Sequence, residues 1–307
     1  MKLSRQTREI INIVLFFLIV GLALTFYMIY PLNRAKALMG RPDADSVVLD
    51  SLPPNDPGLY AESDLTIDTF RIESDGLTSL ACILVAPILD SGAVANGTVV
   101  ILPGEGSSRD SLVPLVTELA GRGLEVMVYD QRANGVSSGQ YRGDGQYEAE
   151  DLQSVIASLA IRDQLALPIT AIGTGLGAEA ALLAAQVENR IGAVIAINPY
   201  LSTTAYIDQL REQHGTIWFP FTRSILWWWY DIRSGYAAEY RDIDEIQGVT
   251  CRTLIALPTD RMDSEGVALL TERSEPGLLT LVTMPDSPER LSETILEFLM
   301  LPQQSNE

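Results

Sequence analysis

Three kinds of hydrophobic pattern follow one another along this chain. From Ile10 to Tyr30 nearly every residue is apolar and none is charged. At about 1.5 Å per helical residue, this run is long enough to cross a hydrocarbon layer about 30 Å thick. It also exceeds the apolar core of a cleavable signal peptide, which is about 7–15 residues long. We therefore predict an uncleaved transmembrane anchor over residues 10–30, preceded by a short tail at residues 1–9.

A polar segment rich in proline follows the apolar run. Pro31 comes directly after it, and Pro53, Pro54 and Pro57 interrupt the residues further on. Proline has no backbone N–H and its ring clashes with the preceding turn of a helix, so it ends or kinks helices. We expect the anchor helix to stop at Pro31 and residues 31–63 to form a linker.

From residue 64 to residue 302, short apolar runs alternate with amphipathic segments. Residues 98–102 (TVVIL) are largely apolar, which is typical of a strand buried on both faces. Residues 152–159 instead place leucine, valine and isoleucine at helical spacing. Asp75-Gly76 lies between two alternating segments and predicts a β-hairpin at the start. The whole pattern predicts an α/β domain with a mostly parallel, doubly wound sheet and helices on both faces.

The charge and residue counts narrow the function classes. The chain has 40 acidic and 21 basic side chains, a formal net charge of −19, and a single histidine. Such an acidic body repels phosphate backbones, so we expect no nucleic-acid partner. The single histidine and the two cysteines, Cys82 and Cys251, are too few for a multi-histidine or four-cysteine metal site. We expect neither a metal ion nor another cofactor.

Several short motifs occur in a fixed order within residues 64–302. They are Asp75-Gly76, then Pro103-Gly104-Glu105-Gly106, then residues 130–139 (DQRANGVSSG), and then Gly173-Thr174-Gly175-Leu176-Gly177. In these motifs, and in Glu148 and Asp151 between the last two, the chain resembles the α/β-hydrolase superfamily, in its serine-aminopeptidase-like branch of small esterases and peptidases. The resemblance implies the α/β-hydrolase fold, with a helical cap inserted at about residues 201–248.

The resemblance also assigns catalytic positions, and the two that make and break bonds lack the required side chains. The nucleophilic serine is replaced by Gly175, and no histidine follows the last predicted strand, in residues 282–290. The acid would be Asp260 or Asp263. An aspartate in such a triad only orients and stabilises an imidazole, so it supplies no catalysis alone. The sequence therefore predicts a degenerate triad.

Residues around the degenerate site could still bind a ligand. The resemblance implies that the backbone amides of Glu105 and Leu176 form what remains of an oxyanion hole. The cap segment contains the single histidine and all four tryptophans of the chain: His214, Trp218, Trp227, Trp228 and Trp229. Tryptophans in such a segment pack the cap on the core, line an apolar pocket, or touch lipid or a partner.

Three other groups could supply a nucleophile or a base. The segment from Gly135 to Gly139 also fits the pattern Gly-x-Ser-x-Gly, with Ser137 at its centre, but turn residues follow it instead of a helix. Thr174 lies beside the elbow, and His214 is the only imidazole. We expect Ser137 to be structural and His214 to be exposed.

These observations favour a membrane-anchored, catalytically inactive protein of the α/β-hydrolase fold that binds a small acyl or carbonyl ligand or a protein partner. The first alternative is an active esterase or peptidase with a rearranged site that uses Ser137, Thr174 or His214. The second alternative is a structural component of the envelope without a ligand. In each case residues 10–30 are the anchor, and the short N-terminal segment favours a soluble domain on the outer side of the membrane.

Overall fold

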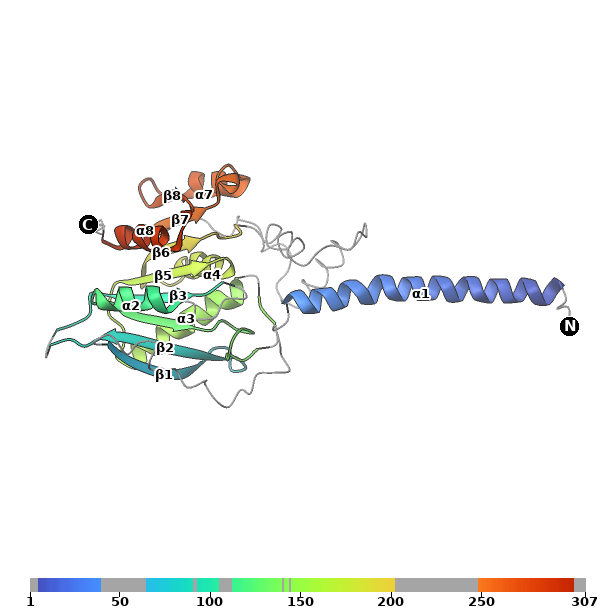
Figure 1. Ribbon diagram of the computed structural model, residues 1–307, viewed down its shortest axis with the longest axis horizontal. Coiled ribbons are helices and arrows are strands. Elements are labelled where there is room, and N and C mark those ends of the chain that lie inside the picture. Colours follow the sequence, from blue (N-terminus) through green and yellow to red (C-terminus); the bar gives the residue numbers. More distant parts are fainter. Residues whose placement is uncertain are drawn as a thin grey trace.

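The computed structural model describes two parts of the chain, a long N-terminal helix and an α/β domain (Figure 1). The described residues are 5–39, 65–90, 93–104, 112–139, 141–143, 145–201 and 248–300. The predicted cap, at about residues 201–248, lies almost wholly outside these ranges. The first tail residues, up to residue 4, lie outside them as well.

Helix α1 (Arg5–Met39) carries the apolar run. Its residues 5–26 are long and apolar enough to cross a membrane, and 0% of that stretch is buried within the protein. Large apolar side chains on this helix are exposed, with Phe17 67% and Leu22 63% exposed. Apolar side chains on all sides of an unpacked helix are costly in water, and a lipid environment would cover them.

Helix α1 does not end at Pro31, which corrects the expected boundary. It continues through Pro31 to Met39. A proline inside a helix removes one backbone hydrogen bond, but the residues that follow it here (LNRAKALM) are mostly strong helix formers. The remainder of the predicted linker, residues 40–63, lies outside the described residues.

In its described residues, the α/β domain is built on one 8-stranded sheet. Its strands are β1 (Leu65–Glu73), β2 (Ser79–Pro87), β3 (Thr98–Leu102), β4 (Glu125–Tyr129), β5 (Ile169–Thr174), β6 (Ile191–Ile197), β7 (Arg252–Leu257) and β8 (Leu279–Thr283). Their spatial order is β1-β2-β4-β3-β5-β6-β7-β8. Strand β2 is antiparallel to both neighbours, whereas every pair from β4–β3 to β7–β8 is parallel. The predicted hairpin and the mostly parallel sheet are confirmed.

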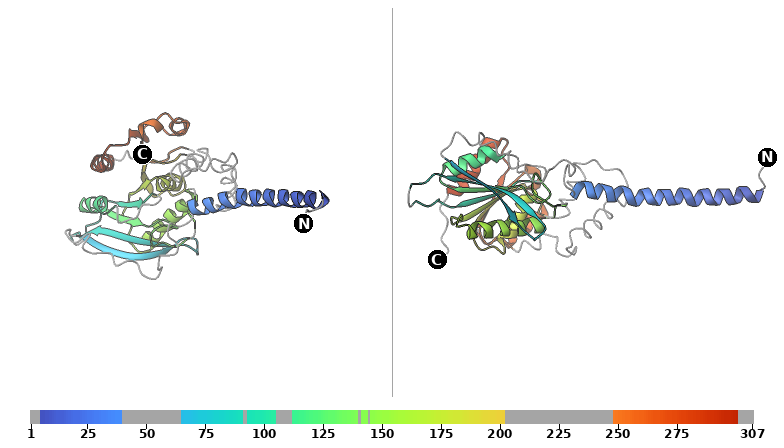
Figure 2. Two further views of the ribbon diagram at one scale, coloured as in Figure 1. Left: turned by 45° about the vertical axis from the view of Figure 1, so that its right-hand side comes forward. Right: turned by 90° about the horizontal axis from the view of Figure 1, so that it is seen from below.

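Helices cover both faces of the sheet (Figure 2). They are α2 (Val113–Gly121), α3 (Gln146–Ile161), α4 (Leu176–Ala185), α7 (Glu265–Arg273) and α8 (Pro288–Met300). One apolar cluster joins the sheet to α2 and α8, and a second joins it to α3, α4 and α7. The doubly wound arrangement predicted from the alternating pattern is therefore confirmed.

The central strands place successive residues in opposite layers. In β3, Val99 and Ile101 belong to the cluster with α2 and α8, whereas Val100 and Leu102 belong to the other cluster. A strand that is buried on both faces offers no polar surface, so binding groups must come from the loops at its ends. Because β3 to β7 are parallel, their carboxyl ends lie along one edge, and the motifs found in the sequence lie at that edge.

Candidate functional site

Strand β5 turns into helix α4 at Gly175, the position at which the resemblance places the nucleophile. Gly175 has φ 55° and ψ −119°, a conformation that other residues enter only under strain. Its carbonyl oxygen accepts hydrogen bonds from the amides of Ala178 and Glu179 at 3.0 and 3.2 Å. The turn therefore has the sharp strand-to-helix geometry that presents a side chain above the sheet, and it presents none.

The two glycines that flank the elbow are required by packing alone. A Cβ atom on Gly173 would lie 2.1 Å from the carbonyl oxygen of Gly177. A Cβ atom on Gly177 would lie 2.4 Å from the carbonyl oxygen of Leu102, at the end of β3. Both distances are far below van der Waals contact, so the first turn of α4 can approach β3 and β5 only if both positions are glycine.

Leu176 begins helix α4 at the place expected for an oxyanion hole. It is 1% exposed, and the amino end of a helix carries partial positive charge that favours a carbonyl oxygen or an anion. The loop after β3 packs on the elbow, because a Cβ atom on Gly104 would lie 3.1 Å from the carbonyl oxygen of Thr174. The other expected donor, Glu105, lies outside the described residues.

The two aspartates proposed for the acid position follow strand β7. Asp260 lies in the short 3-10 helix η5 (Thr259–Arg261), and Asp263 lies two residues beyond its end. Both side chains are exposed to solvent. A triad acid is normally buried against the imidazole that it orients. Neither aspartate has that environment among the described residues, so the structure does not choose between them.

Arg261, which lies between the two aspartates, makes the main contacts of this turn. Its guanidinium donates to the side-chain oxygen of Asn198 at 2.7 Å and to the carbonyl oxygens of Pro199 and Tyr200 at 2.7 and 2.9 Å. Burial lowers the pKa of Arg261, although the charges of Glu179 and Asp260 oppose this shift. Arg261 thus ties the end of β7 to the loop after β6, from which the predicted cap departs.

The position of the catalytic base follows strand β8. Met284 comes directly after this strand, and its amide donates to the carbonyl oxygen of Leu257 at 2.7 Å. The residues from Met284 to Arg290 contain no imidazole. The only histidine, His214, lies outside the described residues, as do Trp218, Trp227, Trp228 and Trp229.

Ser137, which fits the nucleophile pattern by letter, is a structural residue. It is 0% exposed. Its hydroxyl accepts a hydrogen bond from the amide of Ala81 at 2.8 Å and donates to the carbonyl oxygen of Asp130. The side chain therefore joins the loop after β4 to strand β2, and a substrate cannot reach it. Thr174, the other hydroxyl considered, is the half-buried last residue of β5.

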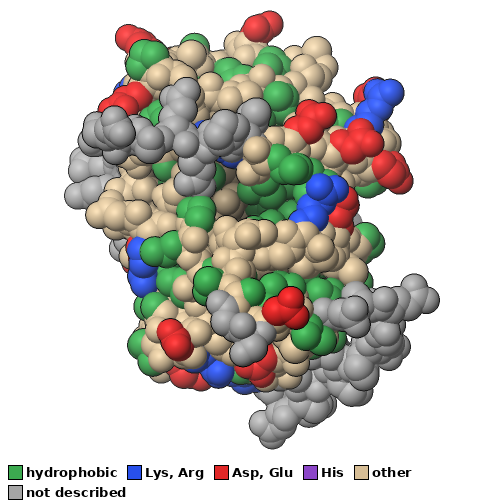
Figure 3. Space-filling model, turned by 90° about the vertical axis from the view of Figure 1, so that its left-hand side faces the viewer, with side chains coloured by type: hydrophobic (Ala, Val, Ile, Leu, Met, Phe, Trp, Pro, Cys, Tyr) green, Lys and Arg blue, Asp and Glu red, His purple; other side chains and the backbone are tan. Residues whose placement is uncertain are grey.

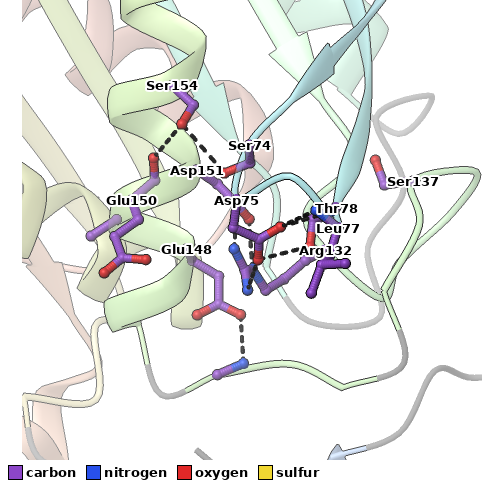
Figure 4. Close-up of polar contacts among 12 residues, drawn as sticks. Ser74, Asp75, Leu77, Thr78, Arg132, Ser137, Glu148, Glu150, Asp151 and Ser154 are labelled. Atoms are coloured by element: carbon purple, nitrogen blue, oxygen red, sulfur yellow. Dashed lines mark hydrogen bonds and ion pairs between the residues drawn. The ribbon is translucent and has the colours of Figure 1, made fainter. Parts of the chain in front are cut away.

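A buried ion-pair network supports the loop after β4, and sequence reasoning did not identify it. Arg132 donates to both carboxylate oxygens of Asp151 at 2.7 Å each, and it lies 3.5 Å from the carboxylate of Asp75 (Figure 4). The ring of Tyr147 packs on the guanidinium at 4.8 Å. The signal available in the sequence was Asp151, an aspartate among the apolar positions of α3 that lies downstream of Arg132. The network fixes the hairpin turn and α3 to this loop.

Glu148 adds a second buried carboxyl group to this region. It accepts hydrogen bonds from the amides of Gly143 at 2.7 Å and Gly145 at 3.1 Å. Burial raises the pKa of Glu148 to about 7, although the charge of Arg132 and the Gly143 amide pull it down. Burial also raises the pKa of Asp151, against the pull of its hydrogen bonds to Arg132. Both groups therefore hold the loop that follows β4.

A comparison with protein families agrees with this architecture. The family model described as "Serine aminopeptidase, S33" matches residues 93–245. Together with the strand order and the elbow, this match shows that the chain has the α/β-hydrolase fold and that residues 93–245 are similar to S33 serine aminopeptidases. No curated protein matches the sequence.

Solved structures with the same fold include several esterases. The esterase Pf2001 of Pyrococcus furiosus superposes with a TM-score of 0.60 at 20% identity, over 87% of this chain and 99% of the esterase. Est1E of Butyrivibrio proteoclasticus, solved with bound ferulic acid, gives a TM-score of 0.55 at 18% identity, over 75% and 98%. An α/β serine hydrolase without a lid from Xanthomonas campestris gives 0.52 at 18% identity, over 76% and 93%. At these identities the similarity shows the fold.

Proposed function

We propose that this protein is a membrane-anchored, catalytically inactive member of the α/β-hydrolase superfamily that binds a ligand at the former active-site edge. The observation that carries the proposal is Gly175 in the elbow conformation. Without a hydroxyl at that position no acyl-enzyme bond can form. Without a histidine after β8, no group in the expected place removes or returns a proton.

The ligand that suits this edge is a small acyl or carbonyl compound. The amino end of α4, which begins at Leu176, offers partial positive charge to a carbonyl oxygen. A glycine at the elbow has no side chain and therefore no nucleophile at the same point. A carbonyl group can therefore sit at the elbow without a nucleophile beside it, and it would be bound but not cleaved.

Helix α1 supports the membrane part of the proposal. Its length and apolar composition suit a single crossing. With the N-terminus on the inner side, the α/β domain would lie on the outer side of the membrane. A membrane-tethered binding domain would then act on ligands or on a protein partner near the membrane surface.

The test uses the full chain in lipid nanodiscs. A fluorophosphonate probe and p-nitrophenyl acetate detect a reactive serine and acyl turnover, and a thermal-shift titration with short-chain acyl amides detects carbonyl binding. We expect no labelling, no turnover above empty nanodiscs, and a saturable shift that Gly175→Val removes by filling the elbow. Labelling that a single Ser→Ala or Thr→Ala substitution abolishes would overturn the proposal in favour of an active, rearranged hydrolase.

A further inference from the structure

A hollow of about 470 Å³ opens at the amino ends of the parallel strands, the edge opposite to Gly175. It lies between the carboxyl ends of α2 and α8, over the beginnings of β3 and β5. Figure 3 looks on to this side of the molecule and shows an apolar depression with a basic group beside it. The volume falls in the range of small-molecule sites, which is about 300–1,000 Å³.

The walls of the hollow are mainly apolar. Leu296 and Leu299 line it from α8, and Leu124 and Pro168 line it from the segments that precede β4 and β5. Leu296 is 7% exposed and belongs to the core cluster beneath α2 and α8. The hollow therefore continues into the packed core, which gives an apolar ligand a firm surface on more than one side.

Thr170 supplies a polar group inside this apolar space. Ile169 and Ala171 belong to the layer of α3 and α4, whereas Ile172 belongs to the layer of α2 and α8, so Thr170 also faces α2 and α8. It lines the hollow and is only 6% exposed. Its hydroxyl makes no hydrogen bond to any residue that the structure describes.

The neighbouring threonine shows how such a group is normally satisfied. The hydroxyl of Thr98 accepts a hydrogen bond from the amide of Ala166 at 2.9 Å and donates to the carboxylate of Glu125 at 3.3 Å. Buried polar groups in native proteins are nearly always hydrogen-bonded. The hydroxyl of Thr170 has no such partner among the described residues and is open to the hollow, so it can hydrogen-bond to water or to a molecule bound there.

The charges around the mouth are already balanced. Arg122 lies across it, donating to the carboxylate of Glu118 at 3.2 Å and to the sulfur of Met300 at 3.7 Å. Its positive charge also faces the carboxyl ends of α2 and α8, which carry partial negative charge. An added anion would compete with Glu118 and with both helix ends, and an added cation would be repelled by Arg122. An uncharged ligand meets neither cost.

We propose that this hollow is a binding site for a small uncharged amphiphile, with an apolar body against Leu296 and Leu299 and a hydroxyl or carbonyl group bonded to Thr170. The site is separate from the elbow and does not depend on the function proposed for it. A molecule bound there would join the carboxyl ends of α2 and α8 on the side of the domain away from Gly175.

The experiment titrates the full chain in lipid nanodiscs with 4-fluorobenzyl alcohol and follows the fluorine NMR linewidth, with empty nanodiscs as the reference for lipid uptake. The ions 4-fluorobenzoate and 4-fluorobenzylammonium keep the ring and change only the charge and head group. We expect saturable binding of the alcohol, with each ion at least tenfold weaker. Thr170→Val keeps the shape of the side chain and removes the hydroxyl. It should therefore weaken the binding of the alcohol about fivefold, which is the typical contribution of one hydrogen bond.

Two further variants assign the binding to the hollow. Leu299→Trp fills the space and should abolish binding, whereas Leu77→Trp, at a position that is 89% exposed, should leave it unchanged. Gly175→Val, at the opposite edge, should also leave it unchanged. The thermal midpoint of each variant shows whether it is folded. If Leu299→Trp does not fold, the binding measured for Thr170→Val tests the proposal instead. Absence of saturable binding, tighter binding of either ion, or equal binding by Thr170→Val would overturn the proposal.

Discussion

The backbone amide of Gly175 donates a 2.9 Å hydrogen bond to the carbonyl oxygen of Ile197. This bond joins the turn after β5 to the last residue of β6, so the conformation of the turn is held by the neighbouring strand. At φ 55° and ψ −119° a glycine is unstrained, whereas any other residue would be strained. The elbow conformation is therefore held by the sheet edge, with a glycine at position 175.

The first prediction concerns Gly175→Ser, which restores the side chain of a hydrolase. We expect the free energy of unfolding to fall by about 1–3 kcal/mol, because a non-glycine residue is strained in this conformation. We also expect no turnover of p-nitrophenyl acetate, since no histidine follows β8 to activate the hydroxyl. Urea denaturation and an ester assay on the same preparation measure the two quantities.

Gly121→Ala is the matched control for this substitution. Gly121 lies at the end of α2, and beyond its chain neighbours and the backbone of its own helix no described atom lies within 4 Å of the position its Cβ would take. Alanine there should leave stability unchanged or raise it by up to about 1 kcal/mol. A Gly175→Ser variant as stable as the native chain, or one with clear ester turnover, would contradict our interpretation of the elbow.

The sequence was sufficient for the order of the elements and for the position of the elbow, for physical reasons that are visible in particular residues. The run TVVIL at residues 98–102 is buried on both faces, as its apolar pattern predicts. Gly173 and Gly177 are sterically required where α4 meets the sheet. These constraints depend on the backbone, so the elbow can be recognised in the sequence although position 175 is a glycine.

Other features depend on which side chains meet in space, and periodicity does not contain that information. The pairing of Arg132 with Asp151 joins a loop to a helix. The hollow at Thr170 lies between the carboxyl ends of α2 and α8. The predicted end of α1, at Pro31, was wrong because the prediction gave a single proline more weight than the helix-forming residues around it. Local propensity is summed over a segment, and one unfavourable residue does not decide the outcome.

The second prediction concerns the buried ion pair. Arg132 and Asp151 have side chains that are 7% and 0% exposed. Asp151→Asn removes the charge that compensates the guanidinium, and removal of one partner of a buried pair typically costs about 3–5 kcal/mol. The same change in the exposed pair of Arg162 and Asp68, whose side chains are 38% and 49% exposed, should cost less than about 1 kcal/mol. Urea denaturation of Asp151→Asn and Asp68→Asn gives the comparison, and similar losses in both would contradict it.

The third prediction separates structure from catalysis at Ser137. Ser137→Ala leaves the amide of Ala81 without its buried acceptor, so the free energy of unfolding should fall by about 1–3 kcal/mol. Reaction with a fluorophosphonate probe should be the same as for the native chain, because the hydroxyl is 0% exposed. Native-like stability together with a loss of labelling would instead identify Ser137 as the nucleophile of an active enzyme.

The fourth prediction concerns the pH dependence of stability. The pKa of Glu148 is raised from 4.5 to about 7, chiefly because the carboxyl group is buried. Between these two values the folded protein holds a proton that the unfolded chain has released. The unfolded state then binds fewer protons, so the free energy of unfolding decreases as the pH rises from about 5 to about 7, and this contribution levels off above pH 7.

Glu148→Gln removes the titration and should flatten this part of the profile, whereas Glu150→Gln, at an exposed position on the same helix, should leave the slope in place. The measurement is the urea midpoint of the native chain and both variants at pH 5, 6, 7 and 8. Because Asp151 also titrates with a raised pKa, the difference between the native chain and Glu148→Gln is the quantity that isolates Glu148. A difference that does not change between pH 5 and pH 7 would show that this carboxyl group is already ionised in the folded protein, with Arg132 outweighing the effect of burial.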